Sequence, residues 1–174
     1  DANFHQLKRY EMSVDVCNGI RYSDDDQCFV SSRTRLFKIT VRVKNNNGSD
    51  TEFLMRGGQL TRIGVCQLWC KAIKDDNSKK EVALKIRTRT APFPILNARP
   101  MKMEEPLPLR SVHTSVASRL FFDKNTENHE HINGLPNPNQ TFFRLHVFLR
   151  VYTEARRDEV ALLSYLSDRI KVID

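Results

Sequence analysis

Basic side chains gather at three places in the middle of this 174-residue chain. The clusters are Arg33 with Arg35, Lys79 with Lys80, and Lys85 with Arg87 and Arg89. Cations set this close together suit a polyanion, because each phosphate that they neutralise releases condensed counterions. The alternative is a basic face that is simply solvated.

The excess positive charge lies in the same region of the chain. The formal charge is +7 in total, but residues 1–32 carry −3, residues 33–110 carry +10 and residues 111–174 carry zero. No apolar run approaches the roughly 20 residues that cross a bilayer. The middle of the chain is therefore the place to look for contact with a nucleic acid.

Motifs that would carry catalysis or hold a metal are missing. The sequence has no nucleophile elbow and no phosphate-binding glycine loop. The run Asp24 to Asp26 lacks the spacing and the distal Glu of a calcium loop. A zinc site at Cys66 and Cys70 would need His129 and His131, which form only an isolated His-x-His pair in a polar loop. We therefore expect no enzyme activity, no metal and no cofactor.

The cysteine content bears on the cellular compartment. The four cysteines, Cys17, Cys28, Cys66 and Cys70, allow two disulfides but do not make the chain disulfide-dense. Cys66 and Cys70 stand among apolar residues, as buried free thiols do. A reducing intracellular compartment fits this usage best.

Alternation of apolar and polar residues with period two dominates the chain, which predicts strands. Residues 37–43 and 143–151 show it most clearly. Further strands are expected over residues 52–56, 60–73, 82–87, 112–122, 160–166 and 169–173. A helix is the alternative for 60–73 and for 154–166, where good helix formers occur.

Polar and proline-rich stretches separate these strands. Loops or turns are expected over 45–50, 75–80, 90–108 and 123–140, and residues 90–108 hold five of the seven prolines. Seven to nine strands with few helical patterns predict an all-β fold, a sandwich or a barrel. We expect a single domain over residues 1–174, with residues 1–18 as an N-terminal arm, cut from a longer protein.

Three segments, taken in order, resemble one known family. The first runs from Asp25 through Val30 into the basic run that ends at Arg35, and the second is Arg119 to Phe122, followed by Pro136 to Phe143. The third is Leu166 to Val172. This order resembles the DNA-binding domain of the myelin regulatory factor family, within the wider family of the yeast meiotic transcription activator. The resemblance spans residues 19–173, and its most specific piece is Pro-Asn-Pro-Asn-Gln.

The resemblance implies an immunoglobulin-like β-sandwich with long decorated loops that binds double-stranded DNA sequence-specifically. It implies a transcription activator that assembles as a homotrimer and reaches the nucleus after release from an endoplasmic-reticulum-tethered precursor. Membrane contact is expected only from parts of such a protein outside these 174 residues. The alternative is an immunoglobulin-like protein-interaction domain that binds no nucleic acid. An RNA-binding barrel is a further alternative and would need exposed aromatic side chains.

The resemblance and the charge pattern together predict the residues that contact DNA. We assign base or deep-groove contact to Arg33, Arg35 and Arg89, because arginine can bond to guanine with two parallel hydrogen bonds. We assign contact with the DNA backbone to Lys38, Lys80, Arg87, Arg119 and Lys124. Asn125 either bonds to a base or turns the chain. The alternative for Arg119 is an ion pair with one of the carboxylates of Asp24 to Asp26.

Overall fold

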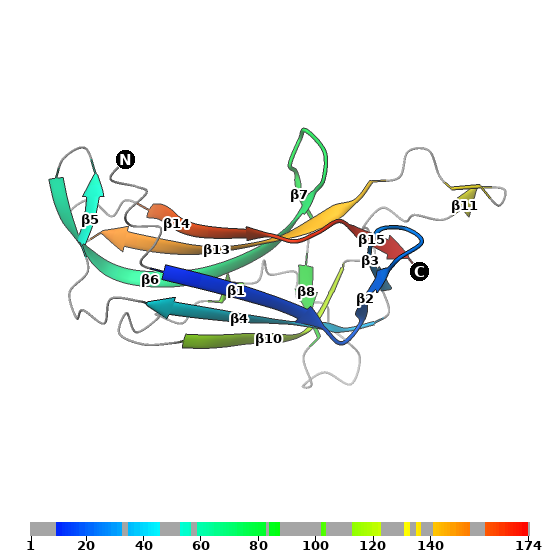
Figure 1. Cartoon of the computed structure of the whole chain (residues 1–174), viewed down its shortest axis with the longest axis horizontal. Coiled ribbons are helices and arrows are strands. Elements are labelled where there is room, and N and C mark those ends of the chain that lie inside the picture. The colour runs from blue at the N-terminus through cyan, green and yellow to red at the C-terminus, as the bar shows by residue number, and fades with distance from the viewer. Residues whose placement is uncertain are drawn as a thin grey trace.

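The chain folds into two facing β-sheets, as the computed structural model shows (Figure 1). The structure describes residues 10–32, 35–45, 53–56, 59–82, 84–87, 102–103, 113–122, 131–132, 135–136, 141–153 and 159–173. Every regular element in these ranges is a strand. The expectation of an all-β sandwich is therefore confirmed.

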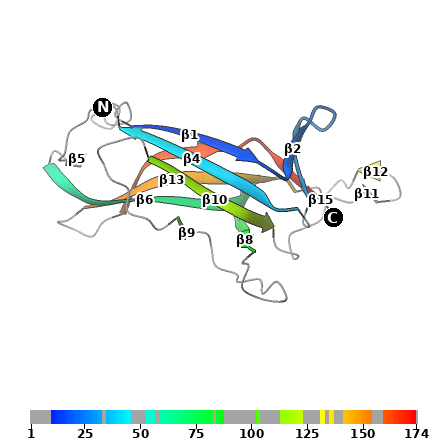
Figure 2. The ribbon, with the colours of Figure 1, turned by 90° about the horizontal axis from the view of Figure 1, so that it is seen from below.

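The smaller sheet has four strands. Its order is β1 (Tyr10–Cys17), β4 (Phe37–Asn45), β10 (His113–Phe122) and β8 (Leu84–Ile86). All of its neighbouring strands run antiparallel. Figure 2 shows β1, β4 and β10 lying across the strands of the larger sheet.

The larger sheet has nine strands. Its main path is β2 (Ile20–Ser23), β3 (Cys28–Ser32), β15 (Ile170–Ile173), β13 (Phe143–Thr153), β6 (Gln59–Lys74) and β5 (Phe53–Arg56). Three more strands pair beside this path: β14 (Glu159–Leu166) on β13, and β7 (Glu81–Val82) and β9 (Lys102–Met103) on β6. A separate two-stranded ribbon consists of β11 (His131–Ile132) and β12 (Leu135–Pro136).

The core lies between the two sheets and follows the period-two pattern. On β4 the side chains of Phe37, Ile39 and Val41 are at most 1% exposed. On β13 the side chains of Leu145 and Val147 are fully buried. The alternating pattern thus identifies the core faces of both strands correctly, because each strand has one face on the core and the other outward.

The described parts of the two segments with a helical alternative are strands, while residues 154–158 of the second segment lie outside the described residues. Residues 59–74 form β6, which pairs with β13 over residues 63–74 and with β5 over residues 59–62. Residues 159–166 form β14, which pairs with the opposite edge of β13. Good helix formers therefore do not decide the structure here, since packing against β13 outweighs local propensity.

The strand predicted over 82–87 is wrong as a single element. Val82 pairs with Ala72 in the larger sheet, whereas Leu84 pairs with Phe122 in the smaller one. The chain crosses the sandwich between these two residues. Alternation continues through the crossing because both sheets bury their side chains in the same core.

The first residues are not only an arm. Within the expected arm over residues 1–18, residues 10–17 form β1, which pairs with β4 along eight residues. Met12, Val14 and Val16 pack against the core. Their spacing of two is the signal that could have predicted this strand.

The described ranges cover the predicted loops only in part. The turn over 75–80 is confirmed, and Asp75 N donates to Phe142 O at 2.8 Å. The predicted loops over 90–108 and 123–140 lie largely outside the described residues, apart from β9, β11 and β12. Cys17, Cys28 and Cys70 are free thiols, so neither a Cys17–Cys28 nor a Cys66–Cys70 disulfide forms.

Candidate nucleic-acid interface

One end of the sandwich brings together most of the predicted DNA-contacting residues that the structure describes. This end carries β2, β3, β15 and the first residues of β4, and it lies opposite β5 (Figure 1). The pairing of Leu120 with Phe37 sets the end of β10 beside the start of β4. Arg119 and Arg35 therefore belong to the same end of the smaller sheet.

Arg87 and Arg119 are neighbours on adjacent strands. Arg87 N donates to Arg119 O at 3.0 Å, directly after the pairing of Ile86 with Leu120. The register of β10 shifts between Ala117 and Leu120, and within this bulge Arg119 takes a φ of 62°. An L-residue with a side chain rarely adopts this conformation, and such strain concentrates at functional sites.

The side chains of this arginine pair have unmet hydrogen-bonding capacity. The Nε atoms of Arg87 and Arg119 are both buried, and neither has a hydrogen-bond partner. The guanidinium of Arg87 stands 5.7 Å from the centre of the Phe121 ring. Within the described ranges no carboxylate forms an ion pair with either arginine, and Asp26 pairs with Lys171 instead. An anion bound nearby would supply the negative charge that no described carboxylate provides to these two side chains.

Arg35 and Lys38 lie close by in sequence but differ in setting. Arg35 is exposed in a tight turn after β3, where its N donates to Ser32 O at 3.1 Å. Lys38 is half-buried on β4 and lies opposite Cys17 of β1. Both positions allow a side chain to reach a ligand at this end.

Lys80 stands apart from the arginine pair. It is exposed at the end of the turn between β6 and β7, where its O accepts a hydrogen bond from Lys74 N at 2.9 Å. It therefore belongs to the larger sheet, whereas Arg87 and Arg119 belong to the smaller one. The remaining predicted contacts, Arg33, Arg89, Lys124 and Asn125, lie outside the described residues.

Sequence reasoning missed Arg21 as a candidate. Arg21 is exposed on β2 and lines a cavity together with Arg35. Arg21 is the one basic residue between residues 10 and 32, and the net charge of this part of the chain is negative. A search for basic clusters therefore does not find it. Only the pairing of β2 with β3 places it near the basic run.

An ionic network links the turn 75–80 to the start of β13 and to the segment just before β15. The Asp75 carboxylate accepts from Arg144 Nε at 2.8 Å and from Arg169 Nε at 2.7 Å, and its side chain is only 10% exposed. Arg144 Nη1 also donates to Ser167 O at 2.8 Å. The carboxylate of Asp75, in the turn, thus contacts Arg144 at the start of β13 and Arg169, the residue directly before β15.

This network lowers the pKa of Asp75. The hydrogen bond from Arg144 is the main cause, Arg169 adds to it, and partial burial opposes both. The charged carboxylate therefore stabilises the fold above its ordinary pKa of 3.8, and this stabilisation is lost as pH falls through the lowered value.

Replacing Asp75 with Asn should lower the free energy of unfolding at pH 7 by about 1–3 kcal/mol, because two guanidinium groups lose their anionic partner. Denaturant titrations from pH 7 to pH 2 measure this. The difference between wild type and D75N should shrink below pH 4, as the wild-type carboxylate takes up its proton.

Asp168→Asn is the matched control, since it removes an exposed neighbouring charge whose side chain has no hydrogen bond among the described residues. It should change the stability little. A D75N protein as stable as D168N at pH 7 would show that the network contributes nothing.

The described aromatic side chains do not form a stacking platform. Trp69 and Phe148 stack on each other across β6 and β13 with ring centres 6.4 Å apart. The guanidinium of Arg150 covers both, at 4.5 Å and 5.0 Å from the ring centres, and Phe148 is only 6% exposed. Among the aromatic residues whose burial is described, only Tyr22 is exposed. This arrangement speaks against an RNA-binding surface built on base stacking.

Comparison with known proteins agrees with the motifs found in the sequence. The chain is 25% identical over 173 residues to myelin regulatory factor homolog 1 of Caenorhabditis elegans, which covers 99% of the chain. It is 27% identical over 177 residues to an uncharacterized protein of Dictyostelium discoideum, which covers 96% of the chain. No protein-family model matches.

These similarities concern a small part of each relative. The chain spans 18% of the nematode protein and 15% of the slime-mould protein. The likeness extends over nearly the whole chain at low identity, and it points to the family of regulatory factors that the motifs resemble.

Two further searches bear on other kinds of site. The described part of the chain holds no cluster of three or more His, Cys, Asp or Glu side chains that could bind a metal ion. It also holds no helix of the length and hydropathy needed to cross a membrane.

Proposed function

We propose that this chain is a DNA-binding domain of a transcription factor and that it binds double-stranded DNA through the basic end of its sandwich. The observation that carries the proposal is the juxtaposition of Arg87 and Arg119, whose buried Nε atoms have no partner. Two arginines on paired strands, with no ion-pair partner among the described carboxylates, suit a phosphate, because a guanidinium group can donate two hydrogen bonds to it. The similarity to myelin regulatory factor homolog 1 supports the same function.

Sequence preference would come from arginines that reach base edges. Arg35 is exposed at the same end and is the described candidate for this role, while the lysines and the arginine pair would hold the DNA backbone. Such a domain acts by binding alone and needs no catalytic group.

The wider assembly is part of the proposal. By the resemblance, the chain would act in the nucleus within a homotrimer. Three copies on one DNA would raise the overall affinity through effective concentration, provided that their recognition sites lie within reach of one another.

A salt-dependent titration against a pool of random duplexes tests the proposed function. If about four or five phosphates are neutralised, the logarithm of the binding constant should fall with the logarithm of salt concentration with a slope of about −3.5 to −4.5. Sequencing of the bound fraction should show an enriched motif. Fluorescence anisotropy on the selected duplex gives the slope.

Two results would overturn the proposal: binding without any salt dependence, or no duplex binding at all at 0.1 M salt. Either would favour the protein-interaction domain. A steep slope without an enriched motif would retain DNA binding but remove the sequence preference.

A further inference from the structure

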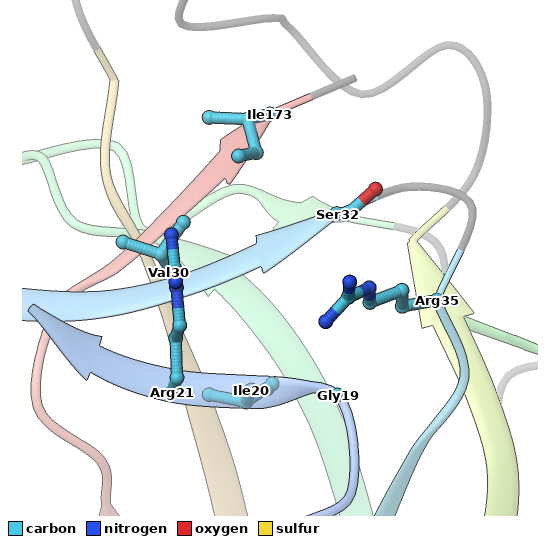
Figure 3. A pocket seen from close by; sticks show the side chains of 7 residues that line it. All are labelled: Gly19, Ile20, Arg21, Val30, Ser32, Arg35 and Ile173. Carbon is cyan, nitrogen blue, oxygen red and sulfur yellow. The ribbon is translucent and has the colours of Figure 1, made fainter.

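A cavity of about 400 Å³ opens at the same end of the sandwich, on the larger sheet. Its floor includes the apolar side chains of Val30 on β3 and Ile173 on β15. Arg21 on β2 and Arg35 after β3 form its walls (Figure 3). The charge clusters and the family resemblance point to Arg35 but not to Arg21, the other arginine of this cavity.

The strand pairing explains why the cavity forms where it does. Arg21 lies directly opposite Val30, and Lys171 of β15 pairs with Val30 from the other side. Arg35 is brought close by the turn in which its N bonds to Ser32 O. In Figure 3 the Arg35 guanidinium extends from the chain that enters β4 into the space beside β2, whereas the Arg21 side chain runs from β2 toward β3 and ends beside Val30.

A glycine fixes the chain on the near side of the cavity. Gly19 has a φ of +127°, and a Cβ at this position would stand 2.4 Å from Leu36 O. The backbone between β1 and β2 is therefore packed directly against the residue that follows Arg35. This close contact holds Arg21 and Arg35 on two walls of one cavity.

The charge of the cavity is positive and uncompensated. No carboxylate in the described ranges pairs with Arg21 or Arg35. The nearby hairpin residue Asp26 already bonds to Lys171 Nζ at 3.2 Å and to the Ser23 hydroxyl. Two arginines thus line one cavity, which favours a phosphate oxyanion within it.

The size and floor of the cavity narrow the choice of ligand. A volume of about 400 Å³ is several times that of an inorganic phosphate ion. Ile173, with a small contribution from the buried Val30, adds a minor apolar surface beside the mainly polar and cationic walls. A sugar–phosphate unit has both features, since its ring is largely carbon and its phosphodiester is anionic.

We propose that this cavity binds one sugar–phosphate unit of the DNA backbone, with the phosphate held by Arg21, which leaves Arg35 on the other wall to reach a base edge. The proposal rests on the DNA-binding function proposed above. It assigns Arg21 a role that fixes the position of the sandwich on the duplex and is independent of base sequence. The arginine pair on the smaller sheet and this cavity on the larger one then hold the backbone at two points.

Arg21→Gln tests the cavity on the duplex selected from the random pool. The variant should bind about tenfold more weakly at 0.1 M salt, equally for the selected duplex and for a scrambled one. The magnitude of its salt slope should fall by about 0.9, because one phosphate contact is lost. Fluorescence anisotropy at four or five salt concentrations measures both values.

Arg42→Gln is the matched control. Arg42 is an exposed arginine on β4, opposite Ser13, away from the cavity. It removes the same charge and should change affinity and slope much less. If R21Q and R42Q behave alike while wild type binds with a steep slope, the cavity proposal fails and the proposed function stands.

A neutral phosphate analogue locates the contact. Duplexes that carry one methylphosphonate at successive positions should include one position that weakens wild type about tenfold and leaves R21Q unchanged. If every position that weakens wild type weakens R21Q equally, the cavity holds no backbone phosphate and the proposal is overturned.

Binding of a small nucleotide tests whether the cavity holds the DNA backbone or a free ligand. Thymidine 3′,5′-bisphosphate should bind wild type only at millimolar concentration, since it lacks the other contacts of the duplex. Micromolar binding that R21Q abolishes, together with unchanged duplex binding by R21Q, would show a site for a free nucleotide and refute the proposal. If wild type binds no duplex at all, the proposed function itself fails.

Discussion

Replacing both Arg87 and Arg119 with Gln should weaken duplex binding by about 100-fold or more at 0.1 M salt. Each arginine would lose one charge-assisted contact with a phosphate, and each tenfold loss corresponds to about 1.4 kcal/mol. The loss should be similar for all sequences, and the magnitude of the salt slope should fall by about two. Fluorescence anisotropy on selected and scrambled duplexes measures these changes.

The stability of this double variant separates a binding role from a structural one. Both Nε atoms are buried without a partner, so the two side chains add little to the fold in the absence of a ligand. The melting temperature should therefore remain the same or rise slightly. The matched control replaces Arg42 and Lys44 with Gln, two exposed cations on β4. A double variant that binds DNA as tightly as this control would remove the observation on which the proposed function rests.

Replacing Gly19 with Ala should give the largest loss of stability among single substitutions at the basic end. The new Cβ would stand 2.4 Å from Leu36 O, and the φ of +127° strains any residue other than glycine. We expect the free energy of unfolding to fall by about 2–4 kcal/mol and the melting temperature by about 5–15 °C. Thermal unfolding followed by circular dichroism provides the measurement.

Asn18→Gly is the control at the neighbouring position. Asn18 has a φ of 61°, a conformation that glycine adopts without strain, and its side chain is exposed. Its stability should remain within about 1 kcal/mol of wild type. If G19A melts at the wild-type temperature, the chain between β1 and β2 can move away from Leu36, and Gly19 does not fix the wall of the cavity.

The sequence predicts most of the sandwich because its long strands show an alternating pattern of apolar and polar residues. In β4 and β13 every second side chain enters the core, so the pattern along one strand reveals which face is buried. The change of sheet between Val82 and Leu84 does not interrupt the alternating pattern, because both side chains contribute to the same core. Secondary structure was therefore predictable where sheet membership was not.

The candidate interface was predictable only for residues that stand in basic clusters or in segments that resemble the family. Arg87 was found from its neighbours in sequence, and Arg119 from the family resemblance. That they share a backbone hydrogen bond follows from the bulge in β10, and arginine gives no sign of a positive φ. Arg21 escaped notice because its partners in the cavity come from β3, β15 and the turn before β4, which only the fold brings together.

The position of β15 has a consequence for how the domain folds. Among the strands that the structure describes, the hairpin of β2 and β3 joins the larger sheet only through β15, which lies between β3 and β13. The pairing is parallel and joins Phe29 to Ile170, residues 141 positions apart, so its loop-closure entropy is high and its formation slow. During synthesis the hairpin emerges early but must wait for the last strand before it can dock. Because Ile173 of β15 also lines the cavity beside Arg21 and Arg35, the cavity can form only after residues 170–173 have been synthesised and have paired with β3.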